Sequence, residues 1–263
     1  MKKIILILFF SIFTSFGVFA GTDGENTISK SKKQSETVND CFETVNRGIF
    51  AFNNALDKVV FKPVAKGYRY LPSVVRTGTG NVLSNLSSVV TIPNNLLQGD
   101  LKSAGTNTAR FVINTTLGIA GIFDAAGYIG FEKLEREDYG QTLGTWGVGP
   151  GCYLVLPVLG PSTVRDTVGS LSTFVGGDAW YNITVANDTR YVNEADYYIS
   201  KATQGVDFRA KNIDSFDNVE ENSLDFYASI RSLYLQDREQ KILNSKKITD
   251  TMDDSDWEEI DSN

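Results

Sequence analysis

The amino-acid sequence predicts a predominantly α-helical fold. Apolar residues recur three or four positions apart in several long segments, and this spacing places them on one face of a helix. Short runs that alternate between apolar and polar residues, which would predict strands, are few. No repeated unit occurs, and the 263 residues are enough for one large domain or two small ones.

The first predicted helix begins near residue 40. Asp40 and Glu43 are three residues apart and resemble a capping box, which satisfies the free N–H groups at a helix start. Lys62-Pro63 predicts the end of this helix, because proline has no N–H and restricts the residue before it. The apolar positions of the helix are Phe42, Val45, Ile49, Phe52, Leu56 and Val59 or Val60.

The same periodicity predicts five further helices. One carries apolar residues from Val75 to Val89 and ends before Pro93, and the next runs from Leu96 to Phe111. A third begins at Ser162, a good N-cap residue, and continues to Val175. The last two cover about 192–210 and 222–243.

The stretch FVINTTLGIAGIFDAAGYIGF, residues 111–131, has the length of a membrane-spanning helix and a single formal charge, Asp124. Four glycines and the polar residues 114–116 interrupt it. The stretch alone is compatible with a buried core helix, a membrane span, or a segment that enters a membrane and turns back. The glycines are Gly118, Gly121, Gly127 and Gly130.

Residues 138–161 have a different composition, with six glycines and three prolines among bulky apolar residues. Such a composition predicts a structured loop, in which only Tyr153 to Leu156 reads as a short extended piece.

Both ends of the chain are predicted to lie outside the folded domain. Residues 1–20 have two lysines, an apolar run and small residues before a cut after Ala20, which is the pattern of a secretory signal peptide. Residues 21–38 are polar and predict a linker. Residues 244–263 predict an acidic disordered tail, since the last fourteen hold seven acidic residues and no basic one. The predicted domain is therefore 39–243.

The composition excludes several kinds of chemistry. The chain has no histidine, which removes Ser-His-Asp and Cys-His catalysis and most catalytic zinc sites. The glycines of 144–151 do not match a phosphate-binding loop, and no basic stripe is present for nucleic acid. The charged stretch 132–138 is interpreted as a solvated loop, although its carboxylates raised the alternatives of acid–base pairing or calcium. No cofactor is expected.

The two cysteines, Cys41 and Cys152, would meet an oxidising compartment after export. The sequence leaves open whether they form a disulfide or stay as two buried thiols.

Several motifs resemble the MlaA (VacJ) family. The family opening D-P-x-E-G-F-N-R is similar to residues 40–47, DCFETVNR, and is followed by FAFN at 50–53. The resemblance continues in unbroken order to about residue 238. Its other segments are KPVAKGYRY (62–70), VRTGTGNVLSNL (75–86), PNNLLQGD (93–100), RFVINTTLGIAGIFDAA (110–126), YGQTLGTWGVGPG (139–151) and YLVLPVLGPSTVRD (153–166).

This resemblance implies a ring of amphipathic helices in the inner leaflet of the outer membrane, beside a trimeric porin, with a channel through its middle. Phospholipid would pass through the channel to a soluble periplasmic carrier, which maintains the lipid asymmetry of the outer membrane. The resemblance also implies a re-entrant, glycine-hinged hairpin that lines the channel, with Asp124 turned to water or a lipid headgroup. The hairpin residues would be Leu117, Gly118, Gly121, Phe123, Asp124 and Gly127, and the structural or channel-rim residues of the first helix would be Asn46, Arg47, Phe50 and Asn53.

The sequence departs from the family pattern in two respects. Many members carry a lipid-modified cysteine at the end of the signal, whereas Ala20-Gly21 stands there in this chain. Both Cys41 and Cys152 occupy positions that the family gives to proline, which favours their pairing. Two rival functions stay open: an exported hydrolase that uses carboxylates on lipid or cell wall, and a structural protein associated with porins.

Overall fold

The computed structural model describes residues 38–187 and 189–258, with side chains as far as Ser245. The predicted signal peptide and nearly all of the linker lie outside the described residues, and so do residues 259–263. The prediction of a predominantly α-helical fold is confirmed. Its helices are α2 (Glu43–Leu56), α3 (Lys62–Arg69), α4 (Ser73–Leu97), α5 (Leu101–Thr116), α6 (Ala125–Tyr128), α7 (Tyr139–Thr145), α8 (Val164–Ser172), α9 (Ala179–Tyr181), α10 (Glu194–Lys211), α11 (Ile213–Asn222) and α12 (Phe226–Glu258).

Three short π-helical segments and one hairpin of strands complete the described part. The π-helical segments are η1 (Asp57–Phe61), η2 (Thr173–Gly177) and η3 (Asn182–Ala186). Strands β1 (Tyr153–Leu156) and β2 (Gly160–Thr163) pair antiparallel, with Tyr153 opposite Thr163. The extended piece predicted at Tyr153 to Leu156 is therefore confirmed.

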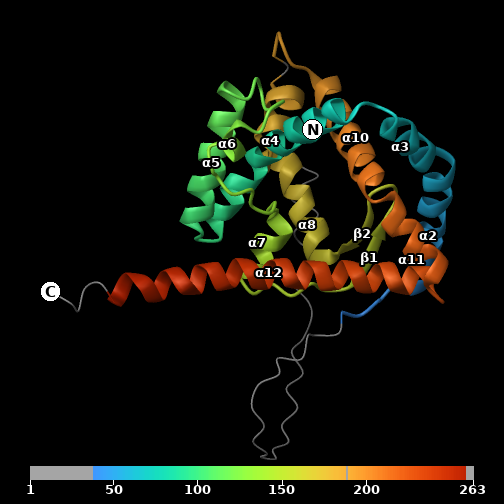
Figure 1. The fold of residues 1–263 in the computed structure, drawn as a ribbon. Helices are drawn as coiled ribbons and strands as arrows, with labels where there is room; N and C mark the ends of the chain where they lie inside the picture. Colours follow the sequence, from blue (N-terminus) through green and yellow to red (C-terminus); the bar gives the residue numbers. More distant parts are fainter. Residues whose placement is uncertain (1–37, 188, 259–263) are drawn as a thin grey trace, which may run out of the picture. The chain divides into compact units, whose positions relative to one another are not determined.

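Within the unit that begins at Val38, the packing contacts form a closed circuit (Figure 1). The circuit runs from α2 through η1, α3, α10, α4, α7 and α8 to β2, and returns from β1 to α2. Helix α12, red in Figure 1, packs along α7, β2 and α11. Helices α5 and α6 pack against each other, and α5 also packs on α4.

The predicted limits of the first helix are wrong at both ends. Asp40 does not cap α2; its carboxylate instead accepts hydrogen bonds from Asn46 and from the Tyr227 hydroxyl. Pro63 does not end the helix, because it lies in the first turn of α3, where a missing N–H is tolerated. The π-helical turn η1 joins α2 to α3 without a break.

Other predicted boundaries need correction for local reasons. Pro93 lies inside α4, and Thr163, not Ser162, caps α8 by accepting a hydrogen bond from Asp166 N. Helices α7 and α11 were not predicted. Helix α12 continues to Glu258, past the predicted start of a disordered tail at residue 244, because neither glycine nor proline occurs between them to stop it.

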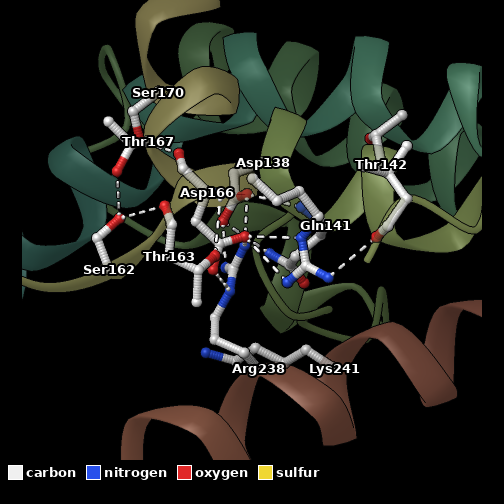
Figure 2. Close-up of polar contacts among 12 residues, drawn as sticks. Asp138, Gln141, Thr142, Ser162, Thr163, Asp166, Thr167, Ser170, Arg238 and Lys241 are labelled. Carbon is white, nitrogen blue, oxygen red and sulfur yellow. Dashed lines mark hydrogen bonds and ion pairs between the residues drawn. The ribbon is translucent and has the colours of Figure 1, made fainter. Parts of the chain in front are cut away.

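A polar cluster that is buried around Arg238 and Asp166 and partly exposed at Asp138 joins α12 to α7 and α8. Arg238 of α12 donates to Asp138 at 2.6 Å and to Asp166 at 2.8 Å, as Figure 2 shows. The hydroxyl of Tyr234, also on α12, donates to Asp166 at 2.6 Å. Asp138 caps α7 through Gln141 N, so one guanidinium fixes the starts of two helices against a third.

This cluster predicts a loss of stability in acid. Burial raises the pKa of Asp138. The hydrogen bonds and positive charge of Arg238, together with hydrogen bonds from Gln141, outweigh burial and lower this pKa to about 2. Since the unfolded value is about 3.9, the stabilisation is complete above about pH 4 and is lost as the pH falls toward 2. Urea unfolding between about pH 5 and pH 2 should show a smaller loss in Asp138→Asn than in the wild type. Equal losses in both proteins would contradict the assignment.

Candidate functional site

The stretch 117–124 forms a tight reversal between α5 and α6. Ile119, Ala120 and Gly121 have φ of 53°, 54° and 89°, a left-handed run that is unusual for residues other than glycine. Gly121 N donates to Asn114 O at 2.8 Å, and Phe123 N donates to Gly118 O at 2.9 Å. The stretch is therefore neither a continuous core helix nor a continuous span; the chain turns back on itself.

Asp124 fastens this hairpin to α5. Arg110 Nη2 donates to its two oxygens at 2.8 and 2.9 Å, and Asn114 Nδ2 donates at 3.0 Å. Burial raises the pKa of the Asp124 carboxyl, but the hydrogen bonds from Arg110, Asn114 and Gly127 N outweigh it and hold that pKa below its usual value. Arg110 pairs with the Asp124 carboxylate, 32% of the Asp124 side chain is exposed, and Asp124 lines the groove described below; that this side chain faces water or a lipid headgroup stays a prediction.

A groove of about 620 Å³ lies between the first half of α4 and the hairpin. One part of its wall is apolar, from Val74, Ile122, Phe123 and Tyr128, and the rest is polar. Asn81 Nδ2 donates to Ile122 O at 3.0 Å and so holds the hairpin on α4. The other lining residues are Ser73, Thr77, Gly78, Asn81, Asp124 and Gly127.

A second, polar pocket of about 30 Å³ adjoins the groove and shares Asn81 and Asp124 with it. Its wall comes from α4, α5 and the segment between α6 and α7. The remaining lining residues are Ser84, Asn85, Ser88, Thr91, Asn107, Arg110, Asn114, Lys133, Leu134, Glu135 and Arg136. A groove with an apolar wall beside a polar pocket can accommodate a molecule with an apolar body and a polar head.

Three of the predicted hairpin residues, Phe123, Asp124 and Gly127, line the groove. Gly118 and Gly121 are buried instead against Asn114 and Asn85, where an added Cβ would lie 2.5 Å and 2.8 Å from those residues. Leu117 is exposed.

Sequence reasoning missed the contribution of Lys133 and Arg136. The charge pattern of their segment predicts a solvated loop. In the structure this segment packs beside α4 and α5, which are distant from it in sequence, and this packing places both side chains in the pocket wall.

The predicted first-helix residues lie elsewhere and bind α2 to the strands. Asn46 is buried, donates to Tyr153 O and accepts from Val155 N. Asn53 does the same with Leu156 O and Val158 N. Arg47 pairs with Asp225, and Phe50 packs edge-on against Phe226 and Tyr227. None of the four lines the groove or the polar pocket. Of the two roles predicted for them, structural residue or channel rim, their contacts therefore support the structural one.

A disulfide joins Cys41 to Cys152, with their Cα atoms 5.6 Å apart. It closes the same contact between the start of α2 and β1, where Tyr153 N also donates to Asn39 O at 2.9 Å. The pairing of Cys41 with Cys152 that the proline positions of the family favoured is therefore present in the structure.

The burial pattern is the reverse of an ordinary domain core. Across the part of the chain with described side chains, more polar and charged residues than apolar ones are buried, and exposed large apolar residues far outnumber buried ones. The apolar stripe of α8 shows this clearly, because Val164, Val168 and Leu171 are all exposed. Contiguous exposed apolar surface indicates contact with lipid or another apolar partner.

No helix among residues 38–187 and 189–258 is both long and apolar enough to cross a membrane.

Comparison with known proteins identifies the family. A model described as MlaA lipoprotein matches residues 38–241, which is most of the chain. The chain belongs to the MlaA lipoprotein family. Among the relatives of this MlaA-family chain, the "Intermembrane phospholipid transport system lipoprotein MlaA" of Haemophilus influenzae is 31% identical and covers 82% of this chain and 84% of its own. The Escherichia coli protein of the same name is 34% identical over 75% of this chain and 76% of its own.

Two further matches agree with the assignment to the MlaA family. An uncharacterized protein of Rickettsia bellii is 36% identical over 78% of this chain and 77% of its own. A solved chain from work on the "Structural basis for maintenance of bacterial outer membrane lipid asymmetry" superposes with a TM-score of 0.64 at 32% identity. The match covers 77% of this chain and 98% of the solved one.

Proposed function

We propose that this chain moves phospholipid from the outer membrane to a soluble periplasmic carrier and so maintains the lipid asymmetry of that membrane. The observation that carries the proposal is the groove between α4 and the hairpin, which is apolar on one side and shares Asn81 and Asp124 with an adjoining polar pocket. Membership in the MlaA family supports it, since relatives bear names of an intermembrane phospholipid transport system.

The energetics of a lipid in water require such a route. Two ordinary acyl chains have on the order of 30 methylenes, and exposing them costs ~0.8 kcal/mol each, or about 24 kcal/mol in total. A transport protein must therefore cover the tails with apolar side chains while the headgroup stays hydrated. The apolar wall of the groove and the polar pocket beside it divide the two tasks in that way.

In this proposal the hairpin 117–127 lines the path of the lipid, and the exposed apolar residues hold the protein in the inner leaflet. Val59, Val60 and Val64 on η1 and α3 are suited to this contact, because they are exposed. Tyr70, which follows α3, is exposed as well and is a side chain typical of the interface. A trimeric porin and a periplasmic carrier are the proposed partners. The transfer makes and breaks no bonds, so no catalytic residue is assigned.

Purification of the protein followed by lipid extraction tests the proposal. We expect phospholipid to co-purify unaltered. Val74→Asp puts a charge into the apolar wall of the groove, and an acyl chain that packs there would bury this charge without a partner. Because that costs more than ~1.4 kcal/mol, the amount of co-purified phospholipid should fall about tenfold. Leu224→Asp is the control, since Leu224 is fully exposed outside the groove and should retain its lipid. Hydrolysis products would instead support the exported hydrolase, and a protein without lipid would support the structural alternative.

A further inference from the structure

The polar pocket has an imbalance of charge. Its wall holds three cations and two carboxylates. Arg110 is occupied, because it binds Asp124 and donates to Phe131 O. Among the described side chains, no carboxylate lies within ion-pair distance of Lys133 or Arg136. Lys133 and Arg136 therefore face the pocket without an ion-pair partner, and the carboxylate of Glu135 in the same wall balances only one of their two charges.

The backbone of this segment is fixed. The buried side chain of Gln141 donates from Nε2 to Arg136 O at 3.2 Å. Asp138, two residues further on, is bound by Arg238 and caps α7. Burial lowers the pKa of the Arg136 guanidinium, and the charge of Asp207 offsets part of this effect. The Arg136 residue is exposed and lines the pocket, so an anion bound there can pair with its guanidinium.

The dimensions and the neighbouring groove select the kind of anion. About 10–15 Å³ of accessible volume accommodates one water molecule, so the pocket of about 30 Å³ has room for roughly two waters, or for the two non-bridging oxygens of a phosphodiester. A guanidinium binds phosphate through two parallel hydrogen bonds. Asn81, at the border with the apolar groove, would lie where the headgroup of an amphipathic ligand meets its acyl chains.

We propose that Arg136, assisted by Lys133, binds the phosphate of a diacyl phospholipid whose acyl chains occupy the groove between α4 and the hairpin. This inference rests on the proposed function and adds to it the headgroup contact. It predicts that the protein recognises the phosphate of the lipid, and that this recognition is separable from binding of the tails.

Binding of defined lipids to the full chain tests the inference. Native mass spectrometry in detergent would compare phosphatidylglycerol with diacylglycerol, which has the same tails and no phosphate. Arg136→Gln should weaken phosphatidylglycerol binding at least about tenfold, which is ~1.4 kcal/mol, because it removes a charged hydrogen bond to the phosphate, and should leave diacylglycerol binding unchanged. Arg190→Gln is the control, because Arg190 is an exposed arginine that lines neither cavity.

The outcomes separate this inference from the proposed function. If Arg136→Gln binds phosphatidylglycerol as tightly as the wild type does, the headgroup contact is wrong while lipid transport stands. If the wild type binds neither lipid, the proposed function itself fails. Inorganic phosphate is the third ligand: binding of phosphate that Arg136→Gln abolishes, with phospholipid binding unaffected, would replace the lipid by a free anion and overturn the inference.

Discussion

Arg238→Met should lower the free energy of unfolding by about 3–5 kcal/mol, the cost of removing one partner from a buried ion pair. Arg238 is 9% exposed and Asp166 is 6% exposed, so water cannot replace the lost hydrogen bonds to that carboxylate. Of the basic side chains that the structure describes, only Arg165, 3.1 Å from Asp166, still pairs with it. Methionine fills a similar volume, and the expected loss therefore comes from the uncompensated charge and not from a cavity.

Lys241→Met is the matched control on the same helix. Lys241 lies three residues further along α12 and pairs with Asp237, whose side chain is 55% exposed. Exposed pairs of this kind contribute only about 0.3–0.5 kcal/mol. Urea unfolding of the two variants and the wild type would measure the difference. A loss for Arg238→Met no larger than that for Lys241→Met would show that the cluster in Figure 2 does not hold α12 on α7 and α8.

Helical periodicity predicted most of the long helices and failed where packing overrides composition. Helix α10 was predicted at 192–210 and lies at Glu194–Lys211, because its apolar spacing and the capping residue Asn193 agree. Helix α7 was missed, since its glycines predicted a loop. The glycines of α7 and α8 instead allow these two helices to pack closely. A Cβ on Gly169 of α8 would lie 2.3 Å from Gly140 N of α7, and no local pattern reveals this contact.

The candidate site could be predicted only in part, because it also depends on packing between segments that are distant in sequence. The glycines and polar residues within the apolar stretch left a core helix, a membrane span and a re-entrant turn open, and only the resemblance to the MlaA family placed a hairpin there. The partner of Asp124 was not foreseen, although Arg110 and Asn114 precede it on the face that α5 turns toward the hairpin. The groove and pocket depend on contacts between α4 and residues 122–136, which are distant in sequence, and a periodicity argument carries no information about such pairs.

Gly118→Ala should open the hairpin. A Cβ at this position would lie 2.2 Å from Phe123 O and 2.5 Å from Asn114 O, and both are backbone atoms that cannot rotate away. Asn114 O also accepts the hydrogen bond from Gly121 N, so moving it disturbs the turn itself. We expect a loss of about 3 kcal/mol in the free energy of unfolding, at the upper end for an overpacked site.

Gly105→Ala is the control that separates this effect from the general consequence of removing a glycine. Gly105 lies within α5 with open space around its missing Cβ, so alanine there should stabilise the protein by about 0.5–1 kcal/mol. Because Phe123 and Asp124 line the groove, Gly118→Ala should also lose co-purified phospholipid, whereas Gly105→Ala should retain it. A folded Gly118→Ala protein with normal lipid content would mean that the hairpin does not shape the lipid site, and the groove would then owe its form to α4 alone.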